Sequence, residues 1–177
     1  MDIPDARADG PVREIVPNGD NRPRRVCSDC GYIEYENPKL VVGAVVTLED
    51  RFLICKRAIE PRIGKWTMPA GYLELDESLA DGAAREVMEE AGARARITGL
   101  LGIYDIPRIG QVHVMHSATM MNDRFEAGPE SLEVRLVPWE NLPWDEFAFP
   151  SVAWAFETFR KSRRPTVTVA PDVSIEP

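Results

Sequence analysis

The chain has 177 residues, of which 44% are hydrophobic and 28% charged, and its formal net charge is −8. This composition is that of an ordinary globular protein with one well-cored domain and extensions, and the negative charge argues against general nucleic-acid binding, which depends on Lys and Arg. No apolar run approaches the ~18 residues that span a membrane and no secretory signal is visible, so we expect a cytoplasmic protein without membrane partners.

The N-terminal segment, residues 1–36, contains an unpaired zinc-ligand motif. Residues 1–24 carry prolines, glycines and charges with little apolar periodicity, which predicts a loosely ordered arm. Cys27 and Cys30 then form a CxxC pair, half of what a structural zinc site usually needs. Because the other cysteine, Cys55, lies in an apolar run and the two histidines are far away, we expect an empty remnant without zinc. A zinc ion shared between two chains is the alternative.

A hairpin and a loop follow the arm. Residues 40–48 and 52–56 are β-branched or apolar runs separated by three charged residues, which predicts two antiparallel strands. Arg57 comes directly after the second strand, and Lys65 lies in the loop 59–68. Either cation is suited to bind a diphosphate, although a solvated surface charge is an equally good interpretation of each.

An α-helix is predicted between Ser78 and Gly92. Ser78 is a good N-cap, Asp81 completes a capping-box pattern, and Gly92 tolerates the left-handed conformation that ends many helices. Three glutamates at i, i+3 and i+4 then crowd one face of the helix. The opposite side is expected to be the buried stripe, consisting of Ala80, Ala83, Ala84, Val87 and Ala91.

The crowded glutamates, Glu86, Glu89 and Glu90, indicate a cation site. Like charges on neighbouring helix positions repel each other, and a sequence tolerates this when a cation lies among them. Mg²⁺ takes oxygen ligands and is often held by a few carboxylates together with substrate phosphates. Arg85 lies next to this face, and Glu77 is placed to pair with it and hold it in position.

The rest of the chain alternates strands and loops and ends in a second helix and a tail. His113 and His116 fall in a strand, where they are more often ordinary strand residues than ligands or bases. The expected elements are strands at 95–97, 100–105 and 111–121 with a turn at 106–110, a loop from 128 entering another strand, a helix at 152–160, and a tail at 161–177.

The segment from Gly71 to Ala93 resembles the Nudix box at every defined position. Gly71 is followed after five residues by Glu77, and after seven more by the run REVMEEAGA that starts at Arg85. The resemblance implies an α/β fold, an α/β/α sandwich with a mixed β-sheet over residues 37–160. It also implies a homodimer that uses Mg²⁺ or Mn²⁺ to hydrolyse a nucleoside diphosphate linked to another moiety.

The resemblance also implies roles for individual residues. The carbonyl of Ala70 and the carboxylates of Glu86, Glu89 and Glu90 correspond to metal ligands, while Arg85 and Glu77 orient them. The base that activates the attacking water is Glu86 or a glutamate of a later loop. For that loop we expect Glu133, with Glu130 as the alternative.

Three stretches outside the box, 36–43, 105–111 and 128–135, resemble a branch that contains FAD and ADP-ribose pyrophosphatases. We therefore expect FAD or ADP-ribose as substrate, giving AMP plus FMN or ribose 5-phosphate. The SQPWPFP signature of NADH pyrophosphatases is missing, which argues weakly against NADH. NADH, another dinucleotide or a nucleotide sugar remain alternatives, as does a Nudix module that senses nucleotides without cleaving them.

Overall fold

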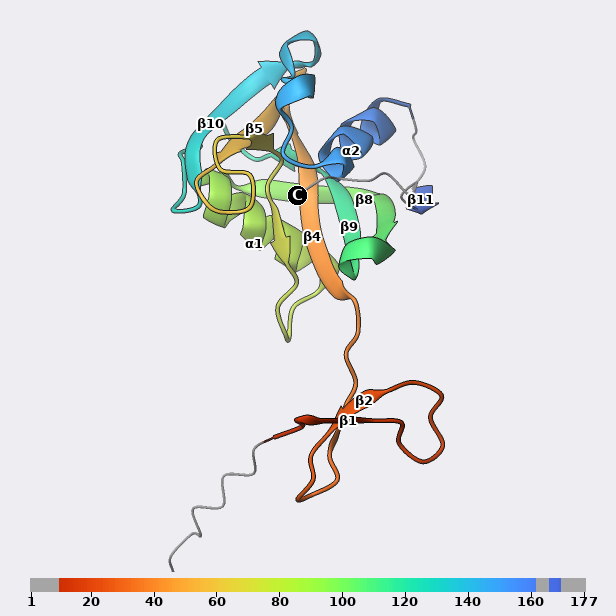
Figure 1. Cartoon of the computed structure of the whole chain (residues 1–177). Coiled ribbons are helices and arrows are strands. Elements are labelled where there is room, and N and C mark those ends of the chain that lie inside the picture. The colour runs from red at the N-terminus through yellow and green to blue at the C-terminus, as the bar shows by residue number, and fades with distance from the viewer. Residues whose placement is uncertain (1–9, 162–165, 170–177) are drawn as a thin grey trace, which may run out of the picture. The chain divides into compact units, whose positions relative to one another are not determined.

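The computed structural model describes residues 10–161 and the backbone of residues 166–169 (Figure 1). The chain divides into two compact units, Met1–Asn37 and Pro38–Pro177. Within the described residues, no helix is long and apolar enough to cross a membrane.

The N-terminal unit contains a small antiparallel sheet, so the expected loosely ordered arm is wrong for the residues that the structure describes. Its strands, in spatial order, are β1 (Arg13–Ile15), β2 (Arg24–Val26) and β3 (Ile33–Glu34). They are two or three residues long and none of their side chains is fully buried, so they leave no apolar periodicity in the sequence. Residues 1–9 lie outside the described part.

The CxxC pair forms the turn between β2 and β3. The N–H of Cys27 donates to the carbonyl of Tyr32 (2.8 Å), and Gly31, at φ 72°, donates to the carbonyl of Cys27 (3.0 Å). The N–H groups of Cys30 and Asp29 lower the pKa of the buried Cys27 thiol. Among the described residues no three His, Cys, Asp or Glu side chains gather around a metal position, and the expected absence of zinc stays a prediction.

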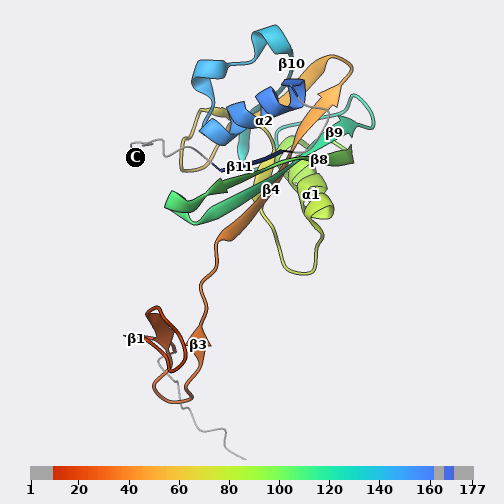
Figure 2. The ribbon, with the colours of Figure 1, turned by 90° about the vertical axis from the view of Figure 1, so that its right-hand side faces the viewer.

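The second unit is built on a mixed eight-stranded sheet (Figure 2). Its strands are β4 (Lys39–Leu48), β5 (Arg51–Arg57), β6 (Trp66–Thr67), β7 (Ala70–Tyr72), β8 (Ala95–Ile106), β9 (Gln111–Met120), β10 (Ser131–Pro138) and β11 (Thr166–Val169). The spatial order is β10-β5-β4-β9-β8-β11, with β6 beside β5 and β7 beside β4. The pairs β4–β9 and β8–β11 are parallel and the other pairs are antiparallel.

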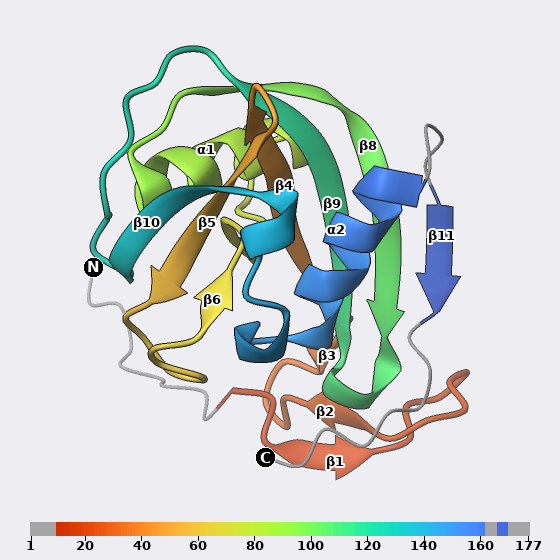
Figure 3. The ribbon, with the colours of Figure 1, turned by 90° about the horizontal axis from the view of Figure 1, so that it is seen from above.

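Two helices cover the two faces of this sheet (Figure 3). Alternate residues of β4 belong to different cores: Val46 packs with Val87 of helix α1 (Leu79–Ala91), and Val45 packs with Phe156 of helix α2 (Pro150–Lys161). This period-two alternation is what a sheet buried on both sides requires. The expected α/β/α sandwich with a mixed sheet is confirmed.

The local elements follow the sequence pattern with a few differences. The expected strands at 95–97 and 100–105 form one strand, β8. Its pairing with β9 shifts register at Gly99 and again at Gly102. The loop 59–68 ends in the two-residue strand β6, which pairs with β5. Three short 3₁₀ turns, η1 (Pro107–Ile109), η2 (Trp139–Asn141) and η3 (Trp144–Glu146), shape the connections, and part of the expected tail forms β11.

Candidate active site

The caps of α1 fix where this glutamate-bearing helix begins and ends. The N–H of Asp81 donates to the hydroxyl of Ser78 (3.1 Å), and this hydroxyl donates to the Asp81 carboxylate (2.6 Å). Gly92 ends the helix at φ 57° and donates its N–H to the carbonyl of Met88. Both expected caps are therefore confirmed, because each contributes the contact that its position requires.

The acidic face of α1 is itself largely buried, which corrects the expected arrangement. Glu86 and Glu90 are only 7% and 6% exposed, whereas Glu89 is exposed. Ala80 and Ala84, which were expected to be buried, are only half-buried. The buried stripe and the acidic face are thus adjacent rather than opposite. The reason is that strand β7 packs against α1 and contacts Glu86 and Glu90.

Strand β7 holds these two carboxylates closely. The N–H of Ala70 donates to Oε2 of Glu90 at 3.3 Å. A Cβ atom added to Gly71 would lie 2.4 Å from Oε1 of Glu86, so the carboxylate occupies the space that any side chain at position 71 would fill. The glycine at the start of the box therefore permits close approach of a carboxylate to the backbone.

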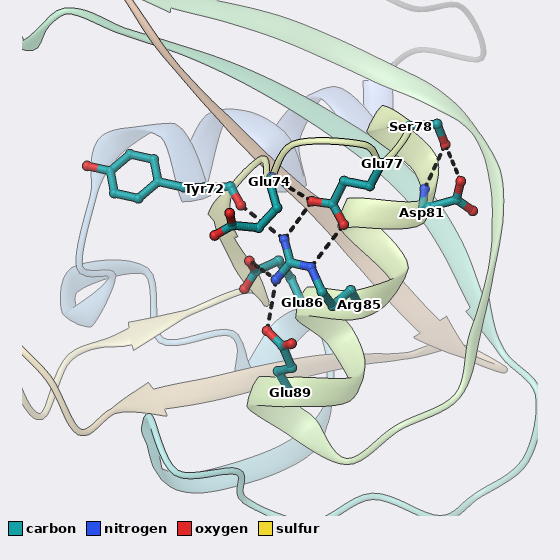
Figure 4. Close-up of polar contacts among 8 residues, drawn as sticks. All are labelled: Tyr72, Glu74, Glu77, Ser78, Asp81, Arg85, Glu86 and Glu89. Carbon is teal, nitrogen blue, oxygen red and sulfur yellow. Dashed lines mark hydrogen bonds and ion pairs between the residues drawn. The ribbon is translucent and has the colours of Figure 1, made fainter. Parts of the chain in front are cut away.

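Arg85 connects the helix to the preceding loop (Figure 4). Its Nε and Nη2 donate to the two carboxylate oxygens of Glu77 (3.0 and 2.8 Å), and Nη1 donates to Glu86 (2.7 Å) and Glu89 (2.8 Å). Nη2 also donates to the carbonyl of Tyr72 (3.0 Å). The bidentate pairing lowers the pKa of Glu77 to about 2. The expected pairing of Glu77 with Arg85 is present, and it holds Arg85 across Glu86 and Glu89.

The electrostatics and donor atoms of this cluster suit a hard divalent cation, although in this structure the three carboxylates do not converge on one point and Nη1 of Arg85 lies between Glu86 and Glu89. Burial raises the pKa of Glu86. The pKa of Glu90 is raised to about 8, mainly by burial and secondly by the negative charge of Glu86. Both carboxylates would be more stable as anions with a cation beside them. The donors are carboxylate oxygens and the nearby carbonyl of Ala70, a set typical of Mg²⁺ or Mn²⁺ sites.

The burial of Glu90 predicts a pH-dependent stability in the metal-free protein. Its folded-state pKa of about 8 lies above the ordinary 4.5, so the folded protein binds more protons than the unfolded chain between these values. This contribution to the free energy of unfolding is fully present below pH 4.5 and is lost as the pH rises through about 8. At about 1.4 kcal/mol per pKa unit, the loss is expected to reach a few kcal/mol.

Urea denaturation in chelator, between about pH 5 and pH 9, measures this loss for the wild type and for Glu90→Gln. The free energy of unfolding of Glu90→Gln should decline much less with pH than that of the wild type, because only the smaller contribution of Glu86, whose pKa burial also raises, remains. Glu133→Gln, at a half-buried strand position where the carboxylate pairs with Arg135, is the matched control and should follow the wild type. Equal slopes for wild type and Glu90→Gln would contradict the prediction.

Gly71→Ala is expected to reduce turnover much more than stability. The added Cβ would displace the carboxylate of Glu86, a flexible side-chain end, rather than backbone. Gly99→Ala on β8 is the matched control, because its Cβ would approach only Oγ of Ser117, at 3.9 Å. Steady-state kinetics and thermal denaturation of both variants test this. A Gly71→Ala enzyme as active as Gly99→Ala would show that the position of Glu86 does not matter.

A cavity of about 740 Å³ opens beside the acidic cluster. Its walls come from α1, β7, the start of α2, the loop after β5, and strands β4 and β9. Glu86, Glu89 and Glu90 line one end of it, together with Arg85. A cavity of this size is in the usual range for small-molecule sites.

The structure separates the two expected phosphate-binding cations. Arg57 lines the cavity: its Nε donates to the carbonyl of Pro61 (2.8 Å), and its guanidinium lies 5.2 Å from the centre of the Phe149 ring. Lys65 is not among the lining residues. It lies in the turn that returns to β6, where its carbonyl accepts from the N–H of Arg57 (2.9 Å). Only Arg57 is therefore placed to contact a molecule in this cavity.

The two loop glutamates are also separated. Glu130 lines the cavity, whereas Glu133 does not: it lies on β10 opposite Lys56 and pairs with Arg135. The loop start explains this placement, because the N–H of Gly128 donates to the carbonyl of Glu90 (3.1 Å) at the end of α1. The geometry therefore favours Glu130, the alternative in the sequence-based expectation, over Glu133.

Several cavity residues were not anticipated from the sequence. Tyr72, Gln111, His113 and Phe149 all line the cavity. The strand that carries Gln111 and His113 does alternate, and the odd-numbered positions face the cavity while Val114 joins the core under α1. The alternation was visible in the sequence, but it did not reveal which face borders a cavity.

The fold and this site define an α/β domain with a mixed sheet and a carboxylate-rich helix beside a cavity large enough for a small molecule. The family model described as "NUDIX domain" matches residues 37–159, and the one described as "Nudix N-terminal", a zinc-ribbon model, matches residues 9–36. The chain belongs to the Nudix family. The expected enzyme class, a Nudix pyrophosphohydrolase, is thereby confirmed.

Individual relatives agree with this assignment. A NUDIX hydrolase of Nitrosomonas europaea superposes with a TM-score of 0.85 at 38% identity, covering 93% of this chain and 98% of that one. An ADP-ribose pyrophosphatase of Methanocaldococcus jannaschii is 26% identical over 63% of this chain and 69% of its own length. Phosphatase NudJ of Escherichia coli is 42% identical over 33% of this chain, and the match spans only 38% of NudJ.

Proposed function

We propose that this protein hydrolyses the diphosphate bond of a nucleoside diphosphate linked to another moiety, with Mg²⁺ or Mn²⁺ as the cofactor. ADP-ribose is the first candidate substrate and FAD the second. The observation that carries the proposal is the shared cavity: the buried carboxylates of Glu86 and Glu90, the loop carboxylate of Glu130 and the guanidinium of Arg57 all line it.

The residues around the cavity divide the work of such a reaction. Ala70, Glu86, Glu89 and Glu90 would hold the divalent cation, which when bound offsets the charge of the diphosphate and polarises a phosphoryl oxygen. Arg85 orients Glu86 and Glu89, and Glu77 in turn orients Arg85. Arg57 supplies a positive charge near the same end of the cavity.

Glu130 is the proposed general base. Its carboxylate lines the cavity at the acidic end, where it raises the pKa of both Glu86 and Glu90 through its charge. A carboxylate there is placed to take the proton of a water molecule that attacks the diphosphate. General base catalysis typically contributes ~10²–10⁴-fold to the rate.

Two observations support the choice of substrate class. The relative from Methanocaldococcus jannaschii carries the name ADP-ribose pyrophosphatase, and this chain covers 69% of it. FAD is supported by the resemblance of residues 36–43, 105–111 and 128–135 to the branch that contains FAD and ADP-ribose pyrophosphatases. NADH, other dinucleotides and nucleotide sugars are the alternative substrates for the same catalytic groups.

A chromatographic product screen with Mg²⁺ tests the proposal on ADP-ribose, FAD, NADH, CoA and dinucleoside polyphosphates. We expect AMP together with ribose 5-phosphate or FMN, and no products in excess chelator. Binding of these compounds without any cleavage would instead indicate a nucleotide-sensing module.

Two further expectations stay predictions. The resemblance implies a homodimer, which light scattering would detect. A cytoplasmic location was expected from the sequence.

A further inference from the structure

The floor of the cavity continues away from the acidic cluster along three paired strands. Gly43 of β4 is opposite Ala70 of β7, and two residues earlier Val41 is flanked by Tyr72 of β7 and His113 of β9. Residues two apart on a strand lie on the same face, roughly 7 Å apart. The row Tyr72–Val41–His113 is therefore the next layer of the floor after the row that contains Ala70.

This next layer carries a chain of uncharged polar groups. Nε2 of Gln111 donates to the hydroxyl of Tyr72 (3.2 Å), and Oε1 of Gln111 is 2.9 Å from Nε2 of His113. Burial lowers the pKa of His113 to about 4, so its ring is neutral at pH 7. With Nε2 as the donor to Gln111, Nδ1 is left as an acceptor, and it is buried without a partner.

The unused hydrogen-bonding capacity of this chain favours a neutral polar ligand. The Tyr72 hydroxyl accepts from Gln111 and keeps its own O–H to donate, and Tyr72 is 48% exposed. His113, by contrast, is 8% exposed, lines the same cavity and is linked to Tyr72 through Gln111. The Tyr72 hydroxyl is therefore the group of this polar chain that can donate to a ligand, and Gln111 and His113 hold it in place.

Charge is distributed unevenly between this layer and the acidic end. The three polar residues are uncharged, and their neighbours Val41 and Ile109 in the lining are apolar. Glu74, two residues after Tyr72, adds to the same lining a carboxylate that would repel a phosphate. The ammonium group of Lys39 lies 5.3 Å from the centre of the Tyr72 ring, but Lys39 is not part of the lining. A phosphate therefore belongs beside Arg57 and the cation site, and an uncharged group belongs over the polar layer.

We propose that Tyr72, Gln111 and His113 form a subsite for the uncharged hydrogen-bonding edge of the group attached to the diphosphate. The chemistry is that of sugar hydroxyls or a base amino group, presented about one strand layer from the diphosphate. The subsite rests on the proposed function for its ligand class. It assigns to these residues the discrimination among compounds that share a diphosphate.

Equilibrium binding of ADP-ribose in excess chelator tests the subsite without requiring hydrolysis. Tyr72→Phe removes one hydroxyl and His113→Leu removes the ring, and calorimetry should show roughly a three- to tenfold weaker Kd for each, as expected for a lost hydrogen bond. Tyr104→Phe and His116→Leu are the matched controls. The hydroxyl of Tyr104 donates to Thr158 (3.0 Å) outside the cavity lining, and His116 is a buried strand histidine with an unpartnered Nδ1 that is also outside the lining.

Three ligand analogues locate the group that is recognised. If an adenosine hydroxyl is bound, Tyr72→Phe or His113→Leu should no longer weaken the Kd relative to the wild type when the 2′-deoxyadenosine analogue is the ligand. The loss of affinity should vanish with the inosine analogue if the base amino group is bound, and with ADP if the distal ribose is bound. Any one of these patterns supports the subsite and identifies its ligand group.

Three results would overturn the subsite. They are wild-type affinity in both Tyr72→Phe and His113→Leu, an equal loss of affinity in His116→Leu, or failure of the wild type to bind ADP-ribose. Failure of the proposed function has a different signature, in which the Kd pattern is present but Mg²⁺ yields no products.

Discussion

Glu90→Gln is expected to lower kcat by orders of magnitude and to shift Mg²⁺ activation to higher concentrations. Glutamine keeps the size of the side chain and can still accept the N–H of Ala70, but it removes a negative charge from a buried site. Metal-ion catalysis contributes several kcal/mol, so a factor on the order of 10²–10⁴ is expected. The measurement is kcat at saturating ADP-ribose over a range of Mg²⁺ concentrations.

The stability of the same variant separates a lost metal ligand from a damaged fold. Because burial raises the pKa of Glu90, the neutral glutamine should leave the metal-free protein at least as stable as the wild type at pH 8. An inactive but stable variant therefore supports the assignment. Near-normal turnover in Glu90→Gln would refute the proposed metal-binding helix.

The features that the sequence predicted well are local in the chain. Ser78 and Gly92 set the ends of α1, and the i, i+3, i+4 spacing then placed the three glutamates on neighbouring positions whatever the rest of the fold did. The pairing of Arg85 with Glu77 is also local, across about the first two turns of α1. Such features need only backbone geometry and could be read from spacing.

The features that the sequence missed depend on long-range pairing. Glu86 is buried because Gly71 belongs to a strand that pairs with β4, about thirty residues earlier in the chain. His113 reaches the cavity because β9 runs parallel to β4 on the other side of the same strand. A helical-wheel argument places residues around an axis, and it does not show which side another strand covers.

The choice between the two loop glutamates was undecidable for the same reason. The sequence places Glu130 and Glu133 three residues apart after the same Gly-Pro pair. A Cβ on Gly128 would lie 1.7 Å from the carbonyl oxygen of Glu89, so the loop begins in direct contact with the end of α1. That contact brings Glu130 to the cavity, while β10 has already begun at Ser131 and carries Glu133 away from it.

Glu130→Gln is accordingly expected to lower kcat by ~10²–10⁴-fold, the usual contribution of a general base. The Mg²⁺ concentration for half-activation should change little, because the metal ligands on α1 are untouched. Glu133→Gln, the matched control three residues away, should keep near-normal turnover, since Glu133 pairs with Arg135 outside the cavity. Steady-state kinetics of both variants at several Mg²⁺ concentrations provide the comparison.

The outcomes of this pair distinguish the three candidate bases. A normal Glu130→Gln enzyme together with an impaired Glu133→Gln enzyme would return the role to Glu133 and would require β10 to reposition when substrate binds. Normal turnover in both variants would leave Glu86 as the base, although Arg85 donates to its carboxylate at 2.7 Å and competes for the same oxygen. Loss of kcat in Glu130→Gln alone would agree with the geometry, in which Glu130 is the loop glutamate that lines the cavity.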